Sequence, residues 1–373
     1  MIWRSGLVVI IILVGIMPGC VSDEDQNAVG DTQNQLETAN NKISAVDISY
    51  YPLISEFNHT YFDRNGDQVD FIDSLIQNGV DTVRLRIWNN ISDSPSSLAQ
   101  VSKFSDLLKS KGLKIWLCPH YSDTWADPSQ QKTPISWESL DFERLKIEVY
   151  EYTRHIVTEI DPDFIQIGNE VNNGMLFPHG NIHHNMTQFL EILEQGSNGV
   201  RDSSERAKII LHFAGLESST SFFDHVKHID YDVAGISYYP LWHGKSIENV
   251  GDVLENIVKS TGKEVVIAET AYPFTLGWND WTDNILGSEN QLIFPEYPAT
   301  PEGQRAFLHD LKKQIFDVDG GIGFCYWGAD MISWDGPESE NGSVWENQAI
   351  FNFENKELPV LMEFNLSYHH AEA

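Results

Sequence analysis

Two short apolar runs of the chain end on a glutamate: Phe164-Ile165-Gln166-Ile167-Gly168-Asn169-Glu170 and Val265-Val266-Ile267-Ala268-Glu269. Each run has the length and the apolar character of a buried strand. In barrels of parallel strands, the side chains that perform chemistry lie at the C-terminal ends of the strands. A lone strand-end glutamate is more often an ordinary charged residue. Two of them on different strands indicate the carboxylate pair that cleaves a glycosidic bond.

Eight such runs follow one another, and amphipathic stretches separate them. The runs are Ala45–Ser49, Thr82–Trp88, Lys114–Cys118, Phe164–Gly168, Lys208–Phe213, Asp232–Ser237, Glu264–Ala268 and Gly323–Trp327. Between them, the apolar spacing predicts helices over 69–77, 101–111 and 138–160. Eight strand-helix repeats predict a single (β/α)8 TIM barrel over 43–373. A doubly wound sheet is the alternative, but it usually has fewer strands and a glycine-rich loop after its first strand.

The N-terminal residues differ in character from the rest of the chain. Arg4 precedes the twelve-residue apolar stretch Gly6–Met17, which is short for a membrane-spanning helix. We interpret 1–20 as an export signal of the lipoprotein type, with Cys20 as the lipidated residue. Simple secretion and an uncleaved anchor are the alternatives. Residues 21–42 are polar and acidic, so we expect a flexible tether that holds the enzyme at the cell surface.

Charge and aromatic content narrow the class of partner. The chain carries 24 Lys and Arg against 55 Asp and Glu, a formal net charge of −31. This balance disfavours nucleic acid and anionic polymers such as polygalacturonate, but not a neutral polysaccharide. Aromatic residues make up 12% of the chain and gather near strand ends, as expected of a cleft that stacks on sugars. Cys118 and Cys325 lie inside predicted strands, so we expect buried free thiols.

Polar and aromatic side chains also follow other strands. Arg84 and Arg86 are two residues apart, so they share one face of their strand, and at least one should hold a carboxylate of the site. A purely structural ion pair is the alternative. Similar clusters end the third, sixth and eighth strands: His120-Tyr121-Ser122-Asp123-Thr124-Trp125, Ser237-Tyr238-Tyr239-Pro240 and Tyr326-Trp327. Core packing does not require these residue types together at one end of a barrel.

These strings resemble glycoside hydrolase family 53, the endo-β-1,4-galactanases. The resemblance extends from Val46 to Phe364, and His120-Tyr121-Ser122-Asp123-Thr124-Trp125-Ala126-Asp127-Pro128 is its most specific part. Further matches are Ile167-Gly168-Asn169-Glu170, Ser237-Tyr238-Tyr239-Pro240, Glu269-Thr270-Ala271-Tyr272-Pro273, Tyr297-Pro298-Ala299-Thr300-Pro301-Glu302-Gly303-Gln304 and Trp345-Glu346-Asn347-Gln348. The resemblance implies an exported arabinogalactan endo-β-1,4-galactanase that retains anomeric configuration through a covalent glycosyl-enzyme. We expect it to act as a monomer.

The resemblance also implies a role for each site residue. Glu170 corresponds to the general acid/base and Glu269 to the nucleophile, which Arg84 keeps ionised. Asn169 would bind the 2-hydroxyl of the sugar, an interaction that strengthens in the transition state. The other expected substrate-binding residues are His120 and Tyr238 at the scissile bond, Trp327 beneath the sugar there, and Trp125 and Trp345 further along the cleft.

The chain departs from the family pattern in three places. Cys118-Pro119 replaces an Asp-Phe pair, and Gly328-Ala329 follows Trp327 in place of Glu-Pro. Many bacterial members bind calcium in the loop after the seventh strand, where this chain offers Asp280, Asp283 and Asn284. The usual ligand pattern is absent, so a solvated loop is the other interpretation. No cofactor is required, because two carboxylates suffice for the reaction.

Two rival functions remain open from the sequence. Another enzyme on the same scaffold, a β-mannanase or a xylanase, would carry a similar glutamate pair. A surface-anchored glycan-binding protein without activity would keep the aromatic residues but would not need both glutamates.

Overall fold

The computed structural model describes residues 42–89, 91–92 and 94–366. The expected export signal at 1–20 lies outside the described residues, and so does the expected tether at 21–42 except for Lys42. In the described ranges, no helix is both long enough and apolar enough to cross a membrane.

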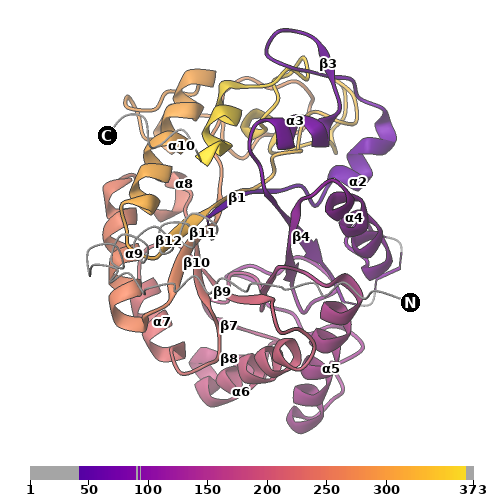
Figure 1. Ribbon diagram of the computed structural model, residues 1–373, viewed down its shortest axis with the longest axis vertical. Helices are drawn as coiled ribbons and strands as arrows, with labels where there is room; N and C mark the ends of the chain where they lie inside the picture. The colour runs from indigo at the N-terminus through magenta and orange to yellow at the C-terminus, as the bar shows by residue number, and fades with distance from the viewer. Residues whose placement is uncertain (1–41, 90, 93, 367–373) are drawn as a thin grey trace, which may run out of the picture. The chain divides into compact units, whose positions relative to one another are not determined.

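Eight parallel strands close into a barrel in the order β1-β12-β11-β10-β9-β6-β5-β4 (Figure 1). The strands are β1 (Ile43–Asp47), β4 (Thr82–Ile87), β5 (Lys114–Pro119), β6 (Phe164–Gln166), β9 (Lys208–Ala214), β10 (Val233–Ser237), β11 (Glu264–Thr270) and β12 (Gly321–Tyr326). Each predicted run overlaps one of these strands. The predicted (β/α)8 barrel is confirmed, and closure of the sheet rules out the doubly wound alternative.

Seven helices of seven or more residues accompany the barrel in the described ranges: α3 (Phe71–Gln77), α4 (Leu98–Ser110), α5 (Phe142–Ile160), α6 (Ile182–Arg201), α7 (Ser219–Val226), α9 (Glu248–Thr261) and α10 (Pro301–Phe316). The shorter helices are α2 (Tyr51–Ile54), α8 (Pro240–His243), η1 (Ser55–Phe57), η2 (Glu289–Gln291), η3 (Glu346–Gln348) and η4 (Pro359–Phe364). Two small hairpins pair β2 (Tyr61–Phe62) with β3 (Gln68–Val69) and β7 (Gly174–Met175) with β8 (Gly180–Asn181).

Capping residues explain where the predicted helices begin and end. The carboxylate of Asp141 accepts from the backbone N–H of Arg144 and starts α5. Asp161 adopts a left-handed φ of 47° at its end, just before Pro162. After α3, Gly79 has φ 99°, and a Cβ there would lie 2.7 Å from the backbone of Asn365, so only glycine fits. The three predicted helices are confirmed as α3, α4 and α5, with shifted ends.

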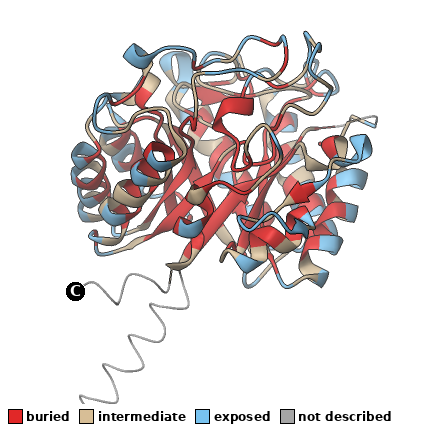
Figure 2. Cartoon of the chain, turned by 90° about the horizontal axis from the view of Figure 1, so that it is seen from above, coloured by how far each residue is buried: buried red, intermediate tan, exposed pale blue. Residues whose placement is uncertain are grey.

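The core has an inner and an outer part. Side chains inside the barrel form one buried cluster, which includes Trp116, Val266 and Ala268. A larger cluster fills the layer between the strands and the helices, and the helices turn exposed faces outward (Figure 2). Cys118 and Cys325 are both buried and free, as predicted.

Alternation along β4 directs its arginines inward. Val83 and Leu85 belong to the outer cluster, so Arg84 and Arg86 point into the barrel, as their spacing predicts. The C-terminal ends of the strands therefore bring together charged groups from separate parts of the chain.

Candidate active site

A cavity of about 610 Å³ lies at the C-terminal ends of the barrel strands. Both predicted catalytic glutamates line it, together with Arg84 and Asn169. Eight of the nine predicted site residues line it: Arg84, His120, Trp125, Asn169, Glu170, Glu269, Trp327 and Trp345. Tyr238 is the exception.

A break in strand register aims Glu269 into the cavity. Along β11, Ile267 packs in the outer cluster and Ala268 in the inner one, so strict alternation would turn Glu269 outward. The pairing with β10 shifts there: Ile236 pairs with Ile267, and the next residue, Ser237, pairs with Glu269. This one-residue bulge turns the carboxylate inward, a known use of bulges near functional sites.

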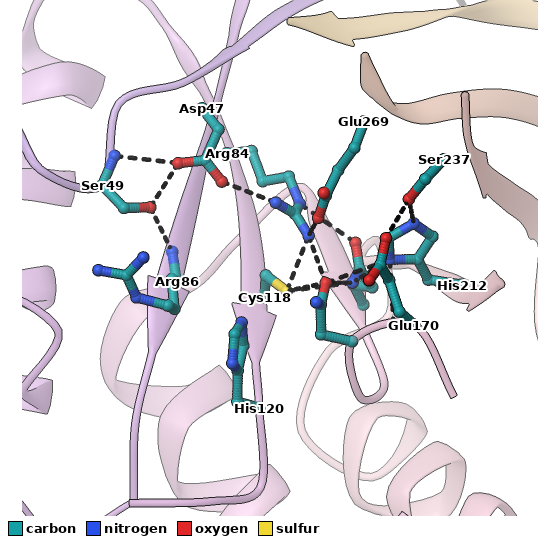
Figure 3. A network of polar contacts seen from close by, with 12 residues as sticks. Asp47, Ser49, Arg84, Arg86, Cys118, His120, Glu170, His212, Ser237 and Glu269 are labelled. Atoms are coloured by element: carbon teal, nitrogen blue, oxygen red, sulfur yellow. Dashed lines mark hydrogen bonds and ion pairs between the residues drawn. The ribbon is translucent and has the colours of Figure 1, made fainter. Parts of the chain in front are cut away.

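Arg84 is the centre of a buried ionic network (Figure 3). Its Nη1 donates to Asp47 Oδ2 at 2.7 Å, and its Nη2 donates to Glu269 Oε1 at 2.8 Å. The same Nη2 lies 2.7 Å from Asn169 Oδ1, and Nε donates to Gln166 Oε1 at 3.2 Å. Arg84 as a whole is 1% exposed, so these partners hold the charge of its guanidinium. Of the two predicted candidates, Arg84 holds the carboxylate.

Arg86 has different surroundings. Its guanidinium lies over the rings of Tyr50, Trp88 and Trp125, at 4.8, 4.8 and 3.9 Å from their centroids. Its Nε donates to Ser96 Oγ at 3.0 Å. Within the described residues it forms no ion pair at 4 Å or less. Cation–π contacts hold Arg86 in place and fix Trp125 at the cavity wall.

Glu170 sits on a strained turn at the end of β6. Gly168 has φ 77° and Glu170 has φ 47°, a left-handed conformation that is uncommon outside glycine. The turn presents the carboxylate to the cavity. Its Oε1 accepts from Ser237 Oγ at 2.6 Å, and no basic side chain of the described chain forms an ion pair with it. The setting of Glu170 is therefore less favourable to negative charge than that of Glu269.

The two carboxylates lie close together. An oxygen of Glu170, an oxygen of Glu269 and a ring nitrogen of His212 are all within 4.8 Å of one another. Burial and the neighbouring Glu269 charge raise the pKa of Glu170. Burial also raises the pKa of Glu269, but Arg84 and the hydroxyl of Tyr239 oppose that rise. Glu269 is therefore the first to ionise, and Glu170 is the group that keeps a proton.

Tyr239, not Tyr238, reaches the carboxylate pair. Along β10 the side chain of Ser237 points into the barrel, so alternation turns Tyr238 outward and Tyr239 inward. The Tyr238 hydroxyl donates to the Gly244 carbonyl at 3.1 Å, and its ring stacks on Phe307. The Tyr239 hydroxyl donates to Glu269 Oε2 at 3.0 Å. Tyr239 therefore lines the cavity where Tyr238 was expected, and alternation from Ser237 was a signal for this.

Aromatic rings form much of the cavity wall. Trp327 packs against Trp345 with ring centroids 4.8 Å apart, and against Trp125 at 6.2 Å. Trp242 lines the same cavity and is 55% exposed; it lies in the aromatic stretch after the sixth predicted strand but was not among the expected site residues. These rings offer flat apolar faces beside the carboxylates.

The remaining predicted residues are held by backbone contacts. His120 Nδ1 accepts from the Ala126 N–H at 3.0 Å, and Asn169 Nδ2 donates to the Ala126 carbonyl at 2.9 Å. Asp47 was not predicted from the sequence, yet it lines the cavity and holds Arg84. Its position at the end of the first predicted strand could have identified Asp47 as a site residue.

In the loop after β11, the three residues expected as possible calcium ligands, Asp280, Asp283 and Asn284, line one cavity. Asp280 is buried, and its carboxylate accepts from the Thr282 N–H at 2.7 Å and the Ser343 N–H at 3.2 Å. Asp283 is exposed. Among the described residues, one group of three or more His, Cys, Asp or Glu side chains is arranged as metal ligands could be, and it is Glu170, His212 and Glu269 in the main cavity. Hydrogen bonds to Asp280 close the loop, so its carboxylate is already engaged.

Several known proteins, which include glycoside hydrolases, resemble this chain in sequence and in fold. The model of glycosyl hydrolase family 53 matches residues 43–364. An arabinogalactan endo-β-1,4-galactanase of Cellvibrio japonicus is 34% identical over 347 residues, which are 86% of this chain and 90% of that protein. The solved family 53 catalytic domain of Ignisphaera aggregans is 35% identical with a TM-score of 0.81, covering 86% of this chain and 95% of that one. A fungal β-1,4-galactanase structure is 26% identical with a TM-score of 0.75, covering 86% and 98%. The chain therefore belongs to glycosyl hydrolase family 53 and is a glycoside hydrolase.

Proposed function

We propose that this enzyme cleaves internal β-1,4-galactosidic bonds of galactan and type I arabinogalactan, with retention of anomeric configuration. The observation that carries the mechanism is the pair Glu170 and Glu269, whose nearest oxygens lie within 4.8 Å. Retaining glycosidases hold their carboxyl groups about 5–5.5 Å apart, whereas inverting ones leave about 6.5–9.5 Å for a water molecule. The short separation favours direct attack by one carboxylate.

In the first step, Glu269 attacks the anomeric carbon and the glycosidic bond breaks. Glu170 gives its proton to the departing oxygen. Arg84 and Tyr239 stabilise the ionised Glu269 before attack, each through a hydrogen bond to a different carboxylate oxygen. The product is a sugar ester of Glu269 and a shortened chain with a free hydroxyl.

In the second step, water attacks the same anomeric carbon from the opposite side. Glu170, now a carboxylate, takes a proton from that water, and the ester bond to Glu269 breaks. Esterification removes the negative charge of Glu269, which lowers the pKa of Glu170 and suits it to act as a base. Two displacements restore the original configuration.

Galactan as the substrate is supported by the relatives and by the cavity. The Cellvibrio japonicus relative carries the name arabinogalactan endo-β-1,4-galactanase. Tryptophan side chains of the cavity suit stacking on sugar rings, and a net charge of −31 suits an uncharged polymer.

The test is digestion of linear β-1,4-galactan with sizing of the products, beside mannan and xylan as controls. We expect mixed oligosaccharides from galactan alone, with the β anomer formed first in NMR spectra. Release from mannan or xylan but not from galactan would contradict the substrate. Binding without release of reducing ends would contradict the enzymatic function.

Azide rescue tests the two roles on substrates with good leaving groups. We expect Glu269→Ala with azide to yield the inverted α-glycosyl azide, because azide occupies the place of the lost nucleophile. We expect Glu170→Ala to yield the β-azide, because azide then attacks the glycosyl-enzyme. The opposite products would mean that the roles are exchanged.

We also propose that the enzyme acts outside the cell, because galactan is too large to enter a cell. We propose a lipid anchor at Cys20 and a monomeric enzyme. Cys20→Ser in the native host should release the protein or leave it unprocessed. Unchanged processing and unchanged membrane attachment would rule out Cys20 as the anchor. Light scattering tests the monomer.

A further inference from the structure

Three buried polar side chains connect Arg84 to the acid Glu170, and the mechanism above gives them no role. Gln166, His212 and Ser237 are each 0% exposed, and they come from the adjacent strands β6, β9 and β10. Gln166 Nε2 lies 2.9 Å from His212 Nδ1, and His212 Nε2 lies 2.9 Å from Ser237 Oγ. Ser237 Oγ lies 2.6 Å from Glu170 Oε1 (Figure 3).

The direction of each hydrogen bond follows from its fixed ends. Arg84 Nε can only donate, so the oxygen of the Gln166 amide faces it and the amide nitrogen faces His212. The backbone N–H of Glu170 also donates to His212 Nδ1, at 3.4 Å. Asn169 Oδ1, 3.2 Å from the same nitrogen, already accepts from Arg84 Nη2 at 2.7 Å and from Gln166 Nε2 at 3.1 Å, which occupy its two lone pairs. Nδ1 is therefore the acceptor and Nε2 carries the proton of the neutral imidazole.

With that tautomer, His212 Nε2 donates to Ser237 Oγ. The serine hydroxyl then has its own proton free to donate onward to Glu170 Oε1. Glu170 Oε2 has no hydrogen-bond partner in the described part of the chain, and the Glu170 side chain lines the cavity.

We propose that Gln166, His212 and Ser237 are positioning residues that keep Oε1 of Glu170 as an acceptor and thereby hold the transferable proton on Oε2. This inference rests on the proposed retaining hydrolysis. In the first step the proton leaves Oε2 for the glycosidic oxygen, and the Ser237 hydroxyl stabilises the carboxylate that forms. In the second step the proton of the attacking water returns to Oε2.

Arg84 gives this chain of hydrogen bonds a second function. It donates directly to Glu269 and, through Gln166, begins the chain that ends on Glu170. When Glu269 becomes an ester, the Arg84 charge is less compensated and polarises the chain more strongly toward Glu170. The chain thus adds to the fall in the pKa of Glu170 between the two steps.

Other charged and titratable groups act on the same carboxyl group. Burial, Glu269 and Asp127 raise the pKa of Glu170, while Ser237 and Arg84 lower it. Burial, Arg84 and His243 hold the pKa of His212 well below its usual range, which keeps the imidazole neutral. Tyr239 also faces both carboxylates. Substitution of Ser237 leaves all of the other groups in place.

The test is Ser237→Ala, with the pH profile of kcat/KM measured on aryl β-galactobiosides. Loss of the donor should move the basic limb up by about one pH unit, because the Glu170 carboxylate loses a hydrogen bond. The acidic limb, which reports Glu269, should stay within about 0.3 of a unit. Activity should fall on the order of tenfold with poor leaving groups and less with good ones, because only poor ones need a well-placed acid.

Matched variants separate this role from a general loss of packing. Ser105 on α4 is buried, and its hydroxyl has no hydrogen-bond partner among the described residues, so Ser105→Ala should leave both limbs in place. Ser237→Thr keeps the hydroxyl and should restore the basic limb. If Ser237→Ala does not fold, His212→Gln, which keeps a donor, is compared with His212→Leu, which does not.

An unmoved basic limb in Ser237→Ala, or equal movement of both limbs, would overturn the proposal. A wild-type enzyme that releases nothing from galactan would instead contradict the proposed substrate. The limbs would then be measured on an aryl β-glycoside that the enzyme accepts, so the two failures are distinguishable.

Discussion

Removal of the Arg84 side chain should cost more stability near neutral pH than in acid. In Arg84→Ala, Asp47 and Glu269 lose ion pairs of 2.7 and 2.8 Å, yet both remain buried, at 4% and 6% exposure. Breaking a buried pair by removing one partner costs about 3–5 kcal/mol, because the other charge is left uncompensated. Both pairs share one guanidinium, so we expect a loss near the upper end of that range, not twice that amount.

The pH dependence follows from Glu269. Burial raises the pKa of Glu269 and Arg84 opposes that rise, so without Arg84 the pKa rises further and the folded variant binds more protons. The free energy of unfolding that Arg84→Ala loses is then small below about pH 4. The loss grows as the pH rises, because ionisation leaves buried charge unpaired. The acidic limb of kcat/KM should also move upward, since Glu269 must be ionised to attack.

Urea unfolding near pH 7 and near pH 4.5 measures the loss of unfolding free energy. The pH profile of kcat/KM gives the position of the acidic limb. Arg206→Ala is the control, because Arg206 also pairs with two carboxylates, Asp161 and Asp163, but is 55% exposed. It should lose less than about 1 kcal/mol at either pH. Should Arg84→Ala not fold near pH 7, Arg84→Lys keeps a charge and should show the same trend with a smaller loss. A penalty independent of pH, with an unmoved acidic limb, would refute the assignment of Arg84 as the group that keeps Glu269 ionised.

Three further predictions concern other parts of the molecule. Tyr239→Phe should lower kcat/KM about tenfold and raise the acidic limb, because Glu269 loses a donor, while Tyr238→Phe should change neither. Burial alone would raise the pKa of Glu363, but its basic partners on α10 lower it to about 2. Glu363→Gln should therefore lose stability at neutral pH, and the loss should shrink as the pH falls from about 4 toward 2; a constant loss would contradict this. EGTA should leave the Tm within about 1 °C, because hydrogen bonds already engage Asp280; a fall that calcium reverses would show a cation site.

The sequence by itself determined the barrel and most of the site. Apolar runs at regular intervals specify parallel strands whichever helices cover them, and eight of them close a barrel. Residues within a few positions of a strand end, such as Glu170 and Trp327, were found because all strand ends meet at one face. The two-residue spacing of Arg84 and Arg86 fixed their common direction, since alternation is a local property of any strand.

Only the tertiary structure decided which side chains meet. A bulge in β11 turns Glu269 inward, and a bulge depends on pairing with a neighbouring strand, which a single run of sequence does not encode. Alternation from Ser237 directs Tyr239 inward, but its hydrogen bond to Glu269 exists only because the bulge turns that carboxylate toward it. Arg84 could have paired with several carboxylates, and its partners Asp47 and Glu269 are 37 and 185 residues away along the chain. Contacts over such separations exist only once the barrel has closed, because closure is what brings the ends of β1, β4 and β11 around one cavity.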